Sequence, residues 1–271
     1  MISACLKIRD LPYFSQQQLV SLRSLNIKQH IPNAITSGNL LCGCLAITEI
    51  FNNNLTGAAY LIGIAAILDF FDGFAARMLK VSSPIGKDLD SLADMVTFGV
   101  VPGFILFKLM AMAQTYSYSE EAIGEVVKTG SINWVNYTAF LIPVFSALRL
   151  AKFNHDIRQS DSFIGLPTPA NTLLIASFPL TLQFGSPALA PYILNTTTLC
   201  SISVILSALL VAELPLIALK FKSFGWKGNE IRYIFMIGCA VLLFLFQVTG
   251  IALAIIFYLI ISLINNLISN S

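Results

Sequence analysis

Apolar runs long enough to cross a lipid bilayer recur from Ile35 to Leu267, and this pattern constrains the fold more than any other feature of the chain. A transmembrane helix needs about 20 mostly apolar residues. Of the 271 residues, 56% are hydrophobic and 11% are charged, whereas a soluble domain has about 25% charged residues. This composition excludes a disordered chain and predicts a polytopic membrane protein.

With about 20 residues per span, the apolar runs predict an all-α transmembrane bundle of eight helices. The predicted helices cover residues 35–51, 57–79, 90–113, 134–153, 170–185, 191–213, 233–248 and 251–267. Pro32 and Asn33 are expected to open the first helix. Only Thr249 and Gly250 separate the last two, which predicts a C-terminal hairpin.

The segment before the first span, residues 1–31, is expected to be a cytoplasmic N-terminal segment. Within it, residues 12–31 mix apolar and polar side chains in a pattern that suits an amphipathic helix on the membrane surface. The alternative is an unstructured tail.

Basic residues predict the orientation of the chain in the membrane. All but two of the 16 Lys and Arg residues fall on one side, and only Lys108 and Lys128 fall toward the other. Both termini are therefore expected to be cytoplasmic, in a multi-pass protein of the cell (inner) membrane. The basic residues form no cluster, so nucleic acid is not an expected partner.

Four carboxylates gather where two predicted helices meet at the cytoplasmic side. Asp72 follows Asp69 at i+3 and Asp94 follows Asp90 at i+4, so each pair shares one helical face. A charged side chain in a span costs about 3 kcal/mol, so the group needs compensation. Oxygen ligands without Cys or His favour Mg²⁺ or Mn²⁺. The alternative is pairing with the three nearby cations, which are Arg77, Lys80 and Lys87.

The residues around these carboxylates form a longer motif. It reads Asp72-Gly73-x-x-Ala76-Arg77, followed at fixed spacing by Gly86, Asp90 and Asp94, with Asp69 upstream. This motif resembles the signature of the CDP-alcohol phosphatidyltransferases. The resemblance covers about residues 32–175 and implies a six-helix family core, here residues 32–213, followed by a loop and the hairpin in residues 214–271.

The resemblance also implies the roles of the motif residues. Two metal ions, Mg²⁺ or Mn²⁺, would be held by Asp69, Asp72, Asp90 and Asp94. The cytidine and diphosphate groups would be lined by Gly73, Ala76, Arg77 and Gly86. Asp94 matches the position of the base that takes the proton from the acceptor alcohol.

The first helix carries small polar residues on one face. Thr36, Asn39 and Gly43 follow one another at three- and four-residue spacing, in a stretch that also resembles the family. We expect Thr36 and Asn39 to contact the nucleotide. The alternative is that this face only packs against a neighbouring helix.

Residues 146–154 and 163–170 resemble the membrane-type phosphatidylserine synthases of bacteria and archaea within this family. That resemblance implies a homodimer that transfers the phosphatidyl group from CDP-diacylglycerol to L-serine. Arg149 and Asn154 would bind serine, whose carboxylate needs a cation and whose polar groups need hydrogen-bond partners. Lys152 stands where these synthases more often have Arg. Alternatively, Arg149 and Lys152 bind a lipid phosphate or reflect only the positive-inside bias.

Two other functions remain open at this point. A sister enzyme would use glycerol 3-phosphate or inositol phosphate, whose phosphate dianions call for more cationic partners than Arg149 and Lys152. A divalent-cation transporter would need acidic residues near the bilayer midplane, whereas here they gather at one end of a helix pair.

Overall fold

The computed structural model describes residues 16–121, 133–155, 163–217, 225 and 229–269. Within these residues the prediction of an all-α fold is confirmed. The exception is one short antiparallel pair, β1 (Phe163–Ile164) with β2 (Pro215–Leu216).

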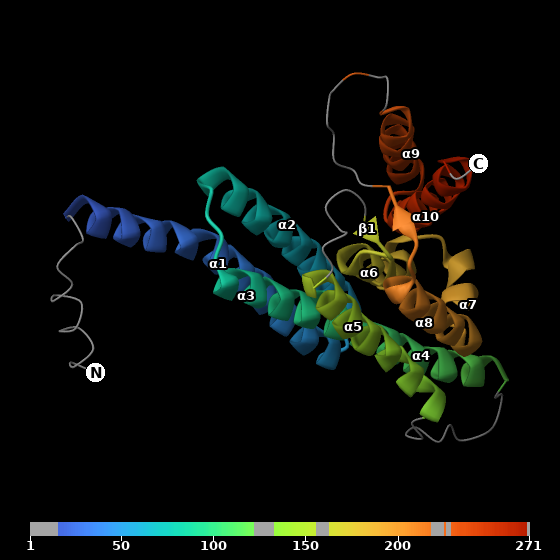
Figure 1. Cartoon of the computed structure of the whole chain (residues 1–271). Helices are drawn as coiled ribbons and strands as arrows, with labels where there is room; N and C mark the ends of the chain where they lie inside the picture. Colours follow the sequence, from blue (N-terminus) through green and yellow to red (C-terminus); the bar gives the residue numbers. More distant parts are fainter. Residues whose placement is uncertain (1–15, 122–132, 156–162, 218–224, 226–228, 270–271) are drawn as a thin grey trace.

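The helices pack side by side as a bundle (Figure 1). In chain order they are α1 (Gln16–Phe51), α2 (Leu55–Leu79), α3 (Pro84–Asp94), the π-helix η1 (Met95–Val100), α4 (Val101–Glu121), the 3₁₀-helix η2 (Trp134–Phe140), α5 (Leu141–His155), α6 (Thr168–Phe184), the 3₁₀-helix η4 (Pro187–Leu189), α7 (Ala190–Ile193), α8 (Thr196–Val211), α9 (Glu230–Phe246) and α10 (Thr249–Ser269). The last two form the predicted C-terminal hairpin, in which the ring of Phe235 stacks on that of Phe257.

Five helical segments of the described chain are long and apolar enough to cross a membrane, and a sixth is present if η4–α7 and α8, bent by 69°, act as one span. α6 and α9 have 17 residues each, or about 26 Å at 1.5 Å per residue, against a hydrocarbon core of about 30 Å. All eight predicted segments are thus mainly helical, but the one predicted at 191–213 is broken between α7 and α8 rather than one continuous helix. The count of eight spans is not confirmed, and the orientation stays a prediction.

Two predicted helix starts were wrong. α1 begins at Gln16 and contains Pro32, because a proline inside a membrane helix is tolerated where neighbouring groups satisfy the freed backbone. Residues 16–31 are therefore helical rather than an unstructured tail, while residues 12–15 lie outside the described part. α3 begins at Pro84, not at residue 90, because Ser83 caps it by accepting a 2.9 Å hydrogen bond from the Gly86 N–H. Gly86 thus lies in the first turn of α3, not between helices.

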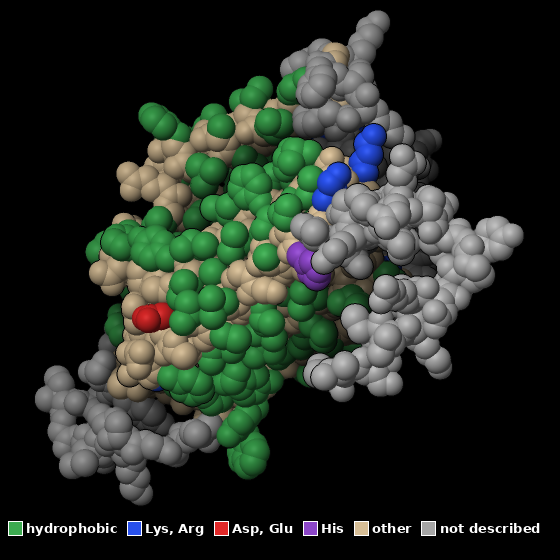
Figure 2. Space-filling view, turned by 90° about the vertical axis from the view of Figure 1, so that its left-hand side faces the viewer, with side chains coloured by type: hydrophobic (Ala, Val, Ile, Leu, Met, Phe, Trp, Pro, Cys, Tyr) green, Lys and Arg blue, Asp and Glu red, His purple; other side chains and the backbone are tan. Residues whose placement is uncertain are grey.

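The core is apolar and the outer surface is apolar too. Side chains such as Ile62 of α2 and Ile105 and Leu109 of α4 are fully buried in one hydrophobic core. Figure 2 shows a face on which hydrophobic side chains predominate and coloured charged side chains are few. A surface of this kind suits lipid rather than water, so the structure supports a multi-pass membrane protein.

The entry into α6 is held by backbone contacts. Gly165 has φ +77°, and a Cβ there would lie 2.8 Å from the carbonyl oxygen of Leu210, so only glycine fits without strain. The N–H groups of Gly165 and Leu166 donate to the carbonyls of Leu214 and Leu209, each at 2.9 Å. These bonds fix the start of α6, at Thr168, against the end of α8.

Candidate active site

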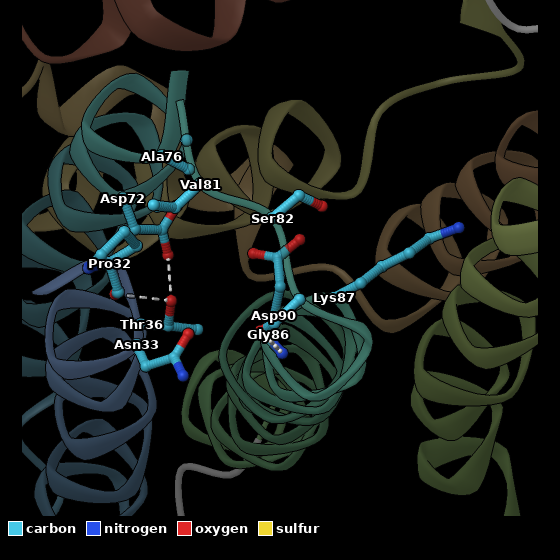
Figure 3. A pocket seen from close by; sticks show the side chains of 12 residues that line it. Pro32, Asn33, Thr36, Asp72, Ala76, Val81, Ser82, Gly86, Lys87 and Asp90 are labelled. Atoms are coloured by element: carbon cyan, nitrogen blue, oxygen red, sulfur yellow. Dashed lines mark hydrogen bonds between the residues drawn. The ribbon is translucent and has the colours of Figure 1, made fainter. Parts of the chain in front are cut away.

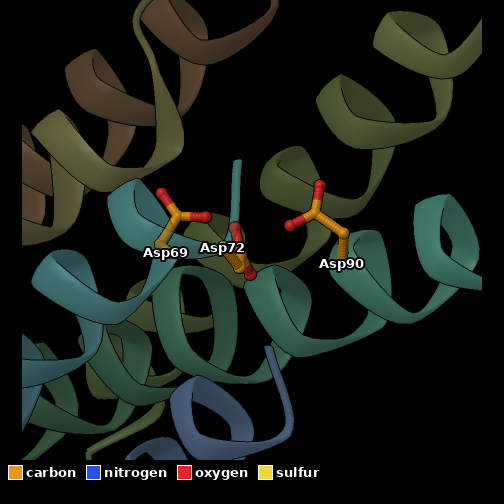
Figure 4. Close-up of side chains that lie close together, drawn as sticks. All are labelled: Asp69, Asp72 and Asp90. Carbon is orange, nitrogen blue, oxygen red and sulfur yellow. The ribbon is translucent and has the colours of Figure 1, made fainter. Parts of the chain in front are cut away.

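A carboxylate cluster forms where the C-terminal half of α2 faces α3. Ligand oxygens of Asp69, Asp72 and Asp90 all lie within 4.8 Å of one another, and Figure 4 shows them around a common space. Lys80 ends α2 in the left-handed conformation, and Ser83 caps α3 three residues later. This short connection turns the chain back so that the two helices present their acidic faces to each other.

The cluster fits a divalent cation. The structure shows no Lys or Arg nitrogen paired with these carboxylates among the residues it describes. Lys87 instead donates to the backbone carbonyl of Asn154 at 3.2 Å, and the Arg77 guanidinium lies over Gly73, where a Cβ would be 3.6 Å from its Nη1. Three adjacent carboxylates without cationic partners repel one another unless a cation joins them. A hard ion with oxygen ligands suits this set.

Thr36 on α1 fixes one of these carboxylates. Its hydroxyl donates a 2.6 Å hydrogen bond to Oδ2 of Asp72, and both side chains are buried. A carboxylate held by a hydroxyl of a neighbouring helix keeps one orientation before any ligand arrives.

A cavity of about 260 Å³ opens beside the cluster (Figure 3). Four of the residues predicted to contact the nucleotide line it together with Asp72 and Asp90; they are Thr36, Gly73, Ala76 and Gly86. Gly86 allows the side chain of Asn33 on the opposite wall of the cavity to come close. A Cβ at position 86 would lie only 2.9 Å from Oδ1 of Asn33. The other two predicted nucleotide residues, Asn39 and Arg77, do not line the cavity.

Asp94 lies outside the group of three. Oδ1 of Asp94 accepts a 3.3 Å hydrogen bond from Nδ2 of Asn39, and its carboxyl group is within hydrogen-bonding range of Asp69. Asn39 is fully buried, and its backbone carbonyl oxygen accepts a 3.2 Å hydrogen bond from the Thr97 hydroxyl. Asn39 therefore holds Asp94 rather than facing the cavity. Gly43, on the same face of α1, packs against Thr97.

A π-helix follows Asp94 directly. The wider turns of η1 bury Thr97, Phe98 and Gly99 in the core while Asp90 and Asp94 face the site. Single π-turns within α-helices occur often at functional sites.

Of the predicted acceptor residues, Arg149 lies near Asp94, whereas Asn154 contacts α3 closer to its start. Arg149 is 8% exposed, donates to the Thr168 hydroxyl at 3.4 Å and lies within electrostatic range of Asp94. Its Nε has no hydrogen-bond partner in the structure. The side chain of Asn154 donates to the Ser91 hydroxyl at 2.8 Å, so it ties α5 to α3.

Sequence reasoning missed several residues of the site. Lys87, Asn33, Ser82 and Ser83 line the cavity as well. Ser83 directly before Pro84 carries a recognisable N-cap signal. Lys87 was considered only as a cation near the carboxylates, and no local pattern places Asn33 or Ser82 in the cavity.

The fold and the site define an integral membrane enzyme whose carboxylate cluster suits a divalent cation beside a cavity with room for a polar substrate. Comparison with models of known protein families also identifies the family of this chain. The chain belongs to the CDP-alcohol phosphatidyltransferase family, whose model matches residues 29–209.

The chain is also similar to proteins named CDP-diacylglycerol–serine O-phosphatidyltransferase. It is 36% identical to that of Bacillus subtilis over 166 residues, which are 59% of this chain and 84% of the relative. It is 32% identical to that of Mycobacterium leprae over 204 residues, 72% of this chain and 60% of the relative. It is 34% identical to that of Helicobacter pylori over 146 residues, which are 53% of this chain and 54% of the relative.

Proposed function

We propose that this protein transfers the phosphatidyl group of CDP-diacylglycerol to the hydroxyl of L-serine and releases CMP. The observation that carries the proposal is the position of Asp94 between the carboxylate cluster and the buried Arg149. The proposal is supported because Asp94 could accept a proton beside both a site suited to a diphosphate and a cation suited to a carboxylate. The three relatives named for the same reaction support the choice of serine.

On the donor side, the cavity lined by Gly73, Ala76 and Gly86 would receive the nucleotide diphosphate, with Arg77 at its rim. Asp69, Asp72 and Asp90 would hold Mg²⁺ or Mn²⁺, and two ions with Asp94 as a further ligand are part of the proposal. Bound there, the metal would supply neutralisation of the negative charge on the diphosphate. Thr36 keeps Asp72 oriented for this task.

On the acceptor side, Arg149 would pair with the serine carboxylate through its unpartnered Nε. Asp94 would take the proton of the serine hydroxyl as the hydroxyl oxygen attacks the phosphorus that bears diacylglycerol. The bond from that phosphorus to the CMP oxygen breaks, and CMP leaves. Asn154 contributes through its bond to Ser91, which holds the end of α5 on α3.

The cellular setting follows from the charge distribution. We place the protein in the cell (inner) membrane with the site toward the cytoplasm, because nearly all Lys and Arg residues fall on that side of the predicted topology. Membrane lipid surrounds it, and the family resemblance supports a homodimer.

The test is CMP release by the purified protein in detergent, with CDP-diacylglycerol and a panel of alcohols. We expect release with serine and none with glycerol 3-phosphate or inositol phosphate. Release with one of those phosphates instead would keep the family and overturn the acceptor. The absence of release with every alcohol, despite bound CDP-diacylglycerol, would overturn the reaction.

A further inference from the structure

A second cavity, of about 240 Å³, lies between α6, α9 and α10. The start of α6 contributes Pro167 and Ala170, and α9 contributes Phe235 and Cys239. The other lining residues are Ala254, Ile255 and Tyr258 of α10, and Ile217. The lining is apolar, and the one hydroxyl in it, that of Tyr258, donates to the backbone carbonyl of Ile217 at 3.1 Å. This cavity, called the hairpin chamber below, thus suits a hydrocarbon group.

The hairpin chamber runs inward from the level of the active site. Pro167 lies directly before Thr168, whose hydroxyl accepts the hydrogen bond from Arg149. At the far end of α6, the Thr181 hydroxyl contacts that of Thr249 at the start of α10. The chamber therefore begins near Arg149 and extends one helical turn, about 5 Å, toward that far end.

Arg149 connects the chamber with the catalytic residues. It lies within electrostatic range of both Asp94 and Tyr258. A molecule with a phosphate at the carboxylate cluster and a hydrocarbon chain attached to it would have an apolar space on the far side of Arg149.

We propose that the hairpin chamber binds part of one acyl chain of the lipid substrate. The inference rests on the proposed function and extends it to α9 and α10, which lie beyond residues 29–209 that match the family model. Burial of methylene groups in the chamber would add to the affinity for long-chain substrate. Ala170 and Ala254 keep the space open because their side chains are small.

The first test fills the chamber with Ala254→Phe and measures kcat/KM for CDP-dipalmitoylglycerol and for CDP-dihexanoylglycerol. We expect the long-chain to short-chain ratio to fall about tenfold, the factor for excluding about two methylene groups. The ratio within one variant cancels a general loss of folded enzyme. The matched control is Ala240→Phe, at an exposed position of α9 outside the chamber, which should leave the ratio unchanged. An unchanged ratio in Ala254→Phe would overturn the proposal.

A second test needs no turnover. In a variant whose other four cysteines are alanine, Cys239 is labelled with a lipophilic maleimide. CDP-dipalmitoylglycerol should slow the labelling, whereas CDP and phosphatidylcholine should not. Equal protection by phosphatidylcholine would show an ordinary membrane lipid in the chamber and overturn the proposal. Failure of the proposed function would give a different result. Serine transfer would then be absent with both chain lengths, while CDP-dipalmitoylglycerol would still protect Cys239 from labelling.

Discussion

The hydroxyl of Thr36 on α1 donates a 2.6 Å hydrogen bond to Oδ2 of Asp72 on α2, and both side chains are buried. The bond joins two helices at a carboxylate that both lines the cavity and belongs to the acidic cluster, as Asp90 also does. The orientation of that carboxylate is therefore set by the packing of α1 on α2.

Thr36→Val should weaken metal binding without unfolding the protein. Because hydrogen bonds to charged groups contribute about 1.5–3 kcal/mol, we expect the metal concentration for half-maximal activity to rise at least about tenfold. The control is Ser37→Ala, since the Ser37 hydroxyl is exposed and bonds only to the Asn33 carbonyl of its own helix. A metal titration of CMP release checks both variants, and identical titrations would contradict the role of Thr36.

Removal of divalent metal should abolish activity. Asp69, Asp72 and Asp90 lie too close together to bind a diphosphate without a cation between them. Excess EDTA should stop CMP release, and Mg²⁺ or Mn²⁺ added back should restore it. Full activity in excess EDTA would contradict the assignment of the carboxylate cluster as a metal site.

The variant Asp94→Asn distinguishes two possible roles of Asp94, that of a base and that of a metal ligand. The asparagine keeps the size of the side chain and one oxygen but cannot take a proton. If Asp94 is the base, turnover should fall by about a hundredfold or more while the affinity for CDP-diacylglycerol is kept. Asp72→Asn should instead weaken metal and nucleotide binding together. Recovery of the full Asp94→Asn rate at high metal concentration would make Asp94 a ligand only.

Arg149→Ala should raise the KM for serine at least about 30-fold, because loss of one partner of a buried charge pair costs about 2 kcal/mol or more. The affinity for CDP-diacylglycerol should change much less. Lys152→Ala is the control, since Lys152 is exposed on the same helix. Equal effects of both variants on lipid affinity would favour a lipid phosphate as the partner of Arg149.

Gly165→Ala should destabilise the protein, because an alanine at φ +77° is strained and its Cβ would press on three backbone carbonyls. A loss of about 1–3 kcal/mol is expected. Gly63→Ala is the matched control, as no atom lies within 4 Å of the added Cβ. Thermal unfolding in detergent compares them, and equal melting temperatures would refute the strain.

Helix periodicity made the carboxylate pairs predictable, since Asp69 and Asp72 share a face whatever surrounds them. The apolar runs likewise located the long helices, although not the start of α3 or the break between α7 and α8. The separation of Asp94 from the cluster was not predictable, because it depends on Asn39 of a distant helix and on the π-helix that follows Asp94.

Contacts between residues far apart in the sequence also explain why some residues have other neighbours than the sequence predicted. Asn154 bonds to Ser91 across 63 positions of the sequence. Tyr258 reaches the neighbourhood of Arg149 only because α10 folds back on α6. No spacing within one helix encodes such contacts.

The π-helix Met95–Val100 has a consequence for how this chain tolerates insertions and deletions. A π-turn takes up one extra residue without rotating the helices on either side. One residue inserted into or deleted from the regular turns of α3 or α4 would instead rotate one helix against the other by about 100°. The acidic face of α3 would then turn from the cavity while the core face of α4 stayed buried. The alignment of the acidic residues with the hydrophobic core therefore depends on the π-turn of this segment.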